Sequence, residues 1–174
     1  MSYVVFPAGP DDALDLARLH VASWRETYRG LLPEDYLAAM SPEAQARRFY
    51  TALMQPEPTD ATLVAANRAG LVGYASGGRS RQGLPGEAEI ATLYVLRAAQ
   101  GRGLGRRLVQ GLARVFAANG AASLTISVLR DNLPARRFYE HLGGLPDVPR
   151  REPGPGGVVA EVSYRWPDIR DLVS

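Results

Sequence analysis

The chain has 174 residues, of which 46% are hydrophobic and 22% are charged, the size and composition of one globular domain. It contains no cysteine, and all 20 basic residues are arginine. These absences exclude disulfides, thiolate nucleophiles, Schiff-base lysines and phosphate loops that need a lysine. The net charge of only +2 does not require a nucleic-acid partner, and two isolated histidines do not indicate a metal site.

The chain also lacks the patterns of membrane insertion and export. No segment approaches the roughly 18 continuous apolar residues that a membrane span needs. Residues Met1 to Pro10 do not show a basic region followed by an apolar run, as a secretory signal would. We therefore expect a cytoplasmic protein that does not associate with a membrane.

The first third of the chain reads as a short strand followed by helices. Tyr3–Phe6 is the expected strand. Apolar residues at helical spacing then predict a helix that starts near Asp11 and ends at Gly30. A second helical stretch follows, from 33 to 40. A third runs from 42 to 54, with Ser41 as its N-cap and a proline in its first position.

The centre of the chain is strand-like. Segments 61–66 and 71–76 flank a short turn and predict a hairpin. A third strand is expected from Glu87 to Leu96, with Leu93 and Val95 in alternation. Ile90 is out of phase with them, which indicates a bulge that shifts the alternation by one residue.

The last part alternates between helices and strands. We expect a helix over 104–118, a strand over 123–128, a helix that begins at Asn132, and a final strand over 158–166. Residues 153–157, rich in proline and glycine, are expected to form a loop. The order of elements predicts an α/β fold in which helices cover a mixed sheet.

The segment Gln100–Arg106 joins the third strand to the next helix and carries three glycines, Gly101, Gly103 and Gly105. Bare backbone lets a ligand approach the amides, and the helix start adds free N–H groups and a positive dipole end. This combination predicts a phosphate or pyrophosphate site. The Rossmann fingerprint fails because Arg106 stands where it needs a glycine. The alternative is a tight turn with surface arginines: Arg102, Arg106 and Arg107.

Two motifs on these elements resemble one family. Gln100, Gly103 and Gly105 match Gln/Arg-x-x-Gly-x-Gly/Ala, the acetyl-CoA signature of the GCN5-related N-acetyltransferases (GNAT). Segment 132–143 is similar to the second signature of the family, Asn-x-x-Ala-x-x-Phe-Tyr-Glu-x-x-Gly, and segment 24–33 to its opening helices. The resemblance implies a single N-acetyltransferase domain over residues 1–174. It also implies a mostly antiparallel mixed sheet with helices on both faces.

The resemblance further implies direct transfer of an acetyl group from acetyl-CoA to a primary amine of a small molecule or peptide, without a metal. Tyr139 would be the general acid for the leaving thiolate, and Asn132 would contact the cofactor arm. The pantetheine and the pyrophosphate would bind to backbone groups of the strand and of the loop. These positions are Leu93, Tyr94, Val95, Gln100, Gly101, Arg102, Gly103, Leu104, Gly105 and Arg106.

The general base is left open by the sequence. Some members of the family carry a glutamate five residues before the asparagine of the second signature, but this chain has Ser127 there. Glu89 is the next candidate, as a base or through a water chain. Two alternatives to Glu89 as the base remain. Glu89 could be a solvated carboxylate at a strand end, or a nearly neutral amine could need only water.

The acceptor is not named by the sequence. Trp24 and Tyr28 lie four residues apart on one helix face and either wall the acceptor pocket or form a buried apolar pair. An acyl-CoA-binding sensor without catalysis is the alternative to an enzyme. Use of longer acyl groups and a nucleic-acid-binding role for the arginines are further alternatives. The resemblance leaves a homodimer open.

Overall fold

The computed structural model describes residues 2–174, which form one eight-stranded sheet flanked by helices. The strands lie in the order β1-β2-β3-β4-β5-β8-β6, and β7 pairs with β8. Neighbouring strands are antiparallel except β4 and β5, which are parallel. The strands are β1 (Val4–Pro7), β2 (Ala61–Asn67), β3 (Gly70–Arg79), β4 (Glu87–Val95), β5 (Ser123–Leu129), β6 (Leu145–Pro146), β7 (Arg150–Gly154) and β8 (Gly157–Trp166).

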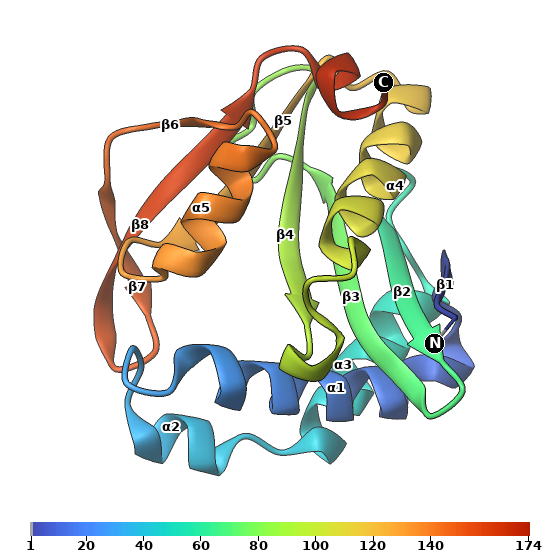
Figure 1. Cartoon of the computed structure of the whole chain (residues 1–174), viewed down its shortest axis with the longest axis vertical. Coiled ribbons are helices and arrows are strands. Elements are labelled where there is room, and N and C mark those ends of the chain that lie inside the picture. Colours follow the sequence, from blue (N-terminus) through green and yellow to red (C-terminus); the bar gives the residue numbers. More distant parts are fainter. Residues whose placement is uncertain (1) are drawn as a thin grey trace.

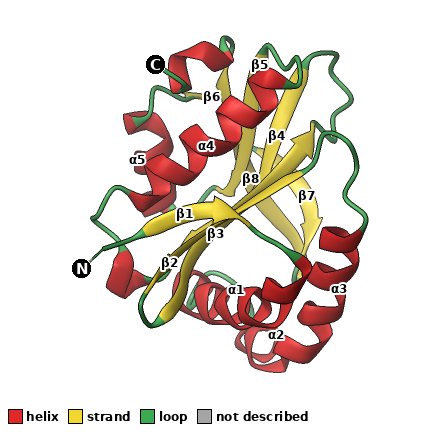
Figure 2. Cartoon of the chain, turned by 90° about the vertical axis from the view of Figure 1, so that its right-hand side faces the viewer, coloured by secondary structure: helices red, strands yellow, loops and turns green. Residues whose placement is uncertain are grey.

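Helices cover both faces of this sheet, as Figures 1 and 2 show. One face packs against α4 and α5, which lie on either side of β4 in Figure 1, and the other face packs against α1 and α3. The expected α/β fold with a mostly antiparallel mixed sheet is therefore confirmed. The helices are α1 (Ala13–Tyr28), α2 (Glu34–Ala39), α3 (Pro42–Met54), α4 (Leu104–Ala118) and α5 (Leu133–His141), with short 3₁₀ turns at Pro10–Asp12, Arg97–Ala99 and Ile169–Leu172.

Local sequence signals explain several of these boundaries. The Ser41 hydroxyl accepts a hydrogen bond from the Ala44 amide at 3.3 Å, so it caps α3 as expected. Gly30, just beyond α1, has φ of +79°, a conformation that favours glycine at a helix end. Among residues 2–174, no helix is both long and apolar enough to cross a bilayer.

The expectation of a loop over residues 153–157 was wrong. Pro153 and Gly154 belong to β7, which pairs with β8, and the turn is confined to the residues after Gly154. An edge strand tolerates proline because one side of its backbone needs no partner. The two-residue strand β6 was also missed, since its apolar residues are too few to show a period.

The sheet opens between β4 and β5, and this opening positions the site. The two strands pair only from Glu87 to Ile90 of β4, opposite Ser123 to Ile126 of β5. The register with β3 then skips Ala91, which confirms the bulge indicated by Ile90. Beyond it, residues 92–95 of β4 pair with β3 alone, while β5 continues against β8.

Candidate functional site

The glycine loop leaves an exposed and unobstructed backbone at the start of α4. Gly101 and Gly103 have φ of +71° and +74°, values that side-chain-bearing residues rarely adopt. A Cβ built on either glycine would have no atom within 4 Å. Gly105 differs, because its Cβ would lie 3.0 Å from the ring of Phe138 on α5. Two of the glycines therefore set the conformation of the loop, and the third allows α5 to approach α4.

The amides of this loop are available to a ligand. The first bond of α4 runs from the Arg107 amide to the Gly103 carbonyl, at 3.0 Å. Within residues 2–174, the main-chain N–H groups from Gly101 to Arg106 have no acceptor. They converge at the positive end of a 15-residue helix, an arrangement that binds anions. The backbone therefore fits the pyrophosphate that the sequence predicted.

The side chains around the loop divide into those that support it and those that remain available. Gln100 donates its side-chain amide to the Val95 carbonyl at 2.8 Å, so it braces the loop against the end of β4. Arg107 donates to the Tyr3 carbonyl, and the Arg102 guanidinium lies 5.7 Å from the centre of the Tyr3 ring. The side chain of Arg106 is exposed and forms no hydrogen bond or ion pair within the described part of the chain.

Tyr139 reaches the opening from α5. Its ring is buried against Tyr164 and Trp166, at centroid distances of 5.6 Å and 6.5 Å. Its hydroxyl makes no hydrogen bond within residues 2–174. Burial raises the pKa of Tyr139 above its ordinary value, and the hydroxyl of Tyr28 on the opposite face of the sheet adds to the effect. The phenol is therefore protonated at neutral pH, and it is electrostatically coupled to the far side of the sheet.

The remaining predicted cofactor contacts surround the same opening. The side chains of Leu93 and Val95 pack toward α4, while Tyr94 points to the opposite face, against α1. Asn132 is buried at the start of α5, where its Oδ1 accepts a 3.3 Å hydrogen bond from the Ala135 amide. Its side-chain NH₂ has no partner within residues 2–174. That group remains able to donate to a ligand.

An aromatic cluster occupies the α1 side of the opening. Trp24 and Tyr28 are half-buried, with ring centroids 4.8 Å apart. The Tyr28 and Tyr94 hydroxyls share a hydrogen bond of 2.7 Å, which ties α1 to β4. His20, one turn before Trp24, is hydrogen-bonded through Nδ1 to the Tyr74 hydroxyl at 2.5 Å. Burial, reinforced by Arg48, lowers the pKa of His20 to about 4.

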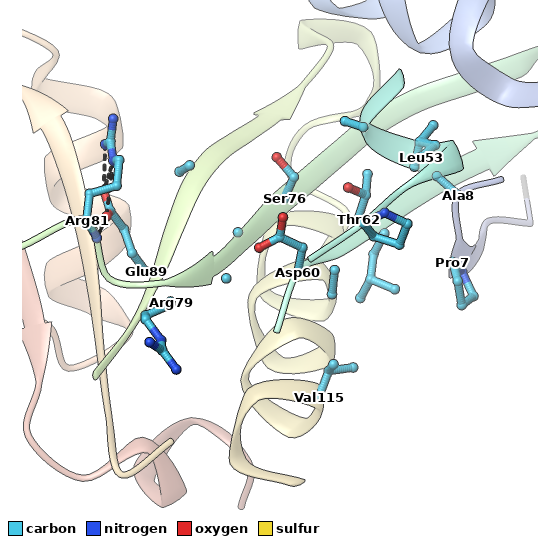
Figure 3. A pocket seen from close by; sticks show the side chains of 17 residues that line it. Pro7, Ala8, Leu53, Asp60, Thr62, Ser76, Arg79, Arg81, Glu89 and Val115 are labelled. Atoms are coloured by element: carbon cyan, nitrogen blue, oxygen red, sulfur yellow. Dashed lines mark hydrogen bonds and ion pairs between the residues drawn. The ribbon is translucent and has the colours of Figure 1, made fainter. Parts of the chain in front are cut away.

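Glu89 lies on this same side of the sheet but is held by an arginine. Its carboxylate contacts the Arg81 guanidinium at 2.6 Å and the Arg81 amide at 2.9 Å. Only 6% of its side chain is exposed. Figure 3 shows the pair at one end of a cleft of about 540 Å³, with Asp60, Thr62 and Ser76 farther along it.

Two residues near the opening were missed by sequence reasoning. Arg81 lies in a glycine- and proline-rich connection, where no periodic pattern indicates which side chains point toward the site. Glu161 does leave a signal, because it is a carboxylate at an outward position of the alternating strand β8. Ser127, where some relatives carry a glutamate, instead forms a 3.0 Å contact between its Oγ and that of Ser163. No set of three or more potential metal ligands gathers within residues 2–174.

Comparison with known proteins points to the family that the sequence resembles. The model of the acetyltransferase (GNAT) family matches residues 21–144. The uncharacterized N-acetyltransferase YuaI of Bacillus subtilis (strain 168) is 29% identical over 164 residues, covering 93% of this chain and 91% of the relative.

Two solved structures show the same fold with a ligand. PaiA N-acetyltransferase from Thermoplasma acidophilum, in complex with coenzyme A, superposes with a TM-score of 0.71 and 19% identity, over 95% of this chain and 100% of that one. YncA from Salmonella typhimurium, a putative acetyltransferase with acetyl-CoA, also gives 0.71, with 17% identity and coverage of 95% and 94%.

Proposed function

The chain belongs to the acetyltransferase (GNAT) family and is an N-acetyltransferase, and from this premise we propose its donor, its chemistry and its acceptor class. The proposed donor is acetyl-CoA. The proposed reaction is direct transfer of the acetyl group to a primary amine of a small molecule or peptide. The observation that carries this proposal is the row of unpaired amides from Gly101 to Arg106, beside the opening between β4 and β5.

The proposed binding mode follows the available groups. The loop amides and Arg106 hold the pyrophosphate, while main-chain groups of residues 93–95 that face away from β3 contact the pantetheine arm. The Asn132 NH₂ group donates to the same arm. When bound, acetyl-CoA would supply the activated acetyl thioester beside the opening between β4 and β5.

Tyr139 is the proposed proton donor to the departing sulfur. A buried phenol with a raised pKa stays protonated, so it can donate but does not act as a base at neutral pH. On the other face, Trp24 and Tyr28 border the proposed acceptor site, and Glu89 is one carboxylate near it. No covalent enzyme intermediate is required, in agreement with the absence of cysteine and lysine.

The experiment compares the natural protein with a Tyr139→Phe variant. Acetyl-CoA would be incubated with phenethylamine, spermidine, lysine and an alanyl tripeptide, and free thiol release would be recorded. We expect turnover of at least one amine, and a decrease of tenfold or more in kcat for Tyr139→Phe with unchanged coenzyme A affinity. The fold should tolerate the change because the hydroxyl has no protein partner. Undiminished kcat in Tyr139→Phe would remove the tyrosine as the acid.

A further inference from the structure

Glu161 on β8 is a carboxylate that the proposed mechanism has not yet used. Strand β8 alternates strictly: Val162 and Tyr164 are buried in the core under α4 and α5, so Glu161 and Ser163 face the other way. The Ser127–Ser163 contact confirms that this is the polar face of the β5–β8 pair. Glu161 therefore lies on the side of the sheet that carries the aromatic cluster.

Its position along the strand places it at the mouth of the opening. Glu161 is the register partner of Leu129, the last residue of β5, beyond the point where β5 leaves β4. Tyr28 is close enough for the Glu161 charge to raise the pKa of its phenol, although burial is the larger cause. Burial is the main cause of the raised pKa of Tyr139, and the same Tyr28 hydroxyl raises it further. Tyr28 therefore interacts electrostatically with Glu161 on its own face of the sheet and with Tyr139, the proposed acid, on the other face.

The two candidate carboxylates differ in whether their oxygens are free to contact a ligand. Both oxygens of Glu89 accept hydrogen bonds from Arg81, at distances from 2.6 to 3.2 Å. Glu161 is half-buried, and its carboxylate has no hydrogen bond or ion pair within residues 2–174. Its lone pairs are free for a ligand.

On this geometry, and resting on the proposed function, we propose that Glu161 binds the ammonium form of the acceptor and is the general base of acetyl transfer. Two protons leave the amine nitrogen. One goes to Glu161 and then to solvent. The other ends on the thiol through Tyr139, as the C–N bond forms and the C–S bond breaks with its electron pair on sulfur. Glu89, paired with Arg81, is then a structural part of the acceptor site.

The surroundings of Glu161 raise the pKa of its carboxyl group. Burial raises its pKa above the ordinary value, Arg81 opposes this rise, and the nearby Glu152 and Glu89 reinforce it. Tyr28 on α1 is within range of its charge. Arg150 is opposite on β7, where its guanidinium is 3.7 Å from Asp147. The raised pKa makes this carboxylate a better proton acceptor than an exposed glutamate.

The test is the pH dependence of kcat/KM for Glu161→Gln, with the fastest amine of the four named above. The natural protein should show a plateau between the pKa of Glu161 and that of the amine. The variant should be slower by about 100-fold at pH 7, the usual scale for loss of a general base. Its log kcat/KM should rise with a slope of one per pH unit, as the free amine forms, and approach that of the natural protein about two pH units higher. If Glu161 had only a structural role, the variant would have a lower kcat/KM at every pH but would keep the plateau.

Two controls separate the possible outcomes. Glu152→Gln removes a neighbouring negative charge from β7 and should keep the plateau, while coenzyme A affinity measured by calorimetry should be equal in all variants. If log kcat/KM rises with pH in Glu89→Gln but keeps the plateau in Glu161→Gln, the proposal is overturned in favour of Glu89. If the natural protein acetylates none of the four amines, the proposed function fails. If it does so and Glu161→Gln is unaltered, only the role of Glu161 fails.

Discussion

Replacement of Gly103 by valine should separate ligand binding from folding. A residue with a Cβ at φ of +74° costs about 1–3 kcal/mol of backbone strain. No protein atom lies within 4 Å of that Cβ, so no clash adds to the cost. In a chain of this size we therefore expect the Tm to fall by about 2–4 °C for each kcal/mol. The protein should remain folded.

Gly103→Val should lose much more affinity for coenzyme A than its small loss of stability would explain. The new side chain occupies the open space beside the loop amides and keeps an anion from reaching them. Charge-assisted hydrogen bonds contribute about 1.5–3 kcal/mol each, so losing two costs about 3 kcal/mol or more. That loss corresponds to at least about a 100-fold weaker Kd for coenzyme A.

A matched control exists at the other end of the same helix. Gly120 has φ of +90°, its Cβ would also meet nothing within 4 Å, and it lies just beyond the C-terminus of α4. Gly120→Val should lose comparable stability but bind coenzyme A normally in isothermal titration calorimetry. If Gly103→Val and Gly120→Val bind coenzyme A equally well, the assignment of the loop as the pyrophosphate site is refuted.

Two further predictions concern stability. His20 has a pKa of about 4 in the folded protein against 6.5 when unfolded, so the unfolded chain takes up the proton first. Stability should therefore fall by at most about 3 kcal/mol as the pH drops from about 6.5 toward 4, and His20→Gln should flatten that fall in urea unfolding. Gly77→Ala would place a Cβ 2.0 Å from the Glu89 carbonyl oxygen, whereas Gly9→Ala meets only Asp12 at 3.9 Å. We expect a loss of about 3 kcal/mol for Gly77→Ala and little change for Gly9→Ala, and equal urea midpoints would contradict this reading of the bulge.

Local patterns in the sequence were sufficient for most elements of the fold. The helix over 104–118 was predicted with its observed limits because its apolar residues keep one period over four turns. The bulge near Ile90 was predicted from a single residue out of phase. Strands β6 and β7 were not predicted, because a two-residue strand has no period and a strand ending in Pro-Gly looks like a loop.

The sequence by itself determined the glycine loop, because the conformational freedom of Gly101 and Gly103 and the free amides at a helix start are local properties. The sequence did not determine which carboxylate near the site is free to contact a ligand. Glu89 and Glu161 are both outward residues of strands, and no local pattern distinguishes them. Only the tertiary structure pairs Glu89 with Arg81 and places Glu161 beside Tyr28, because these contacts join segments far apart in the chain.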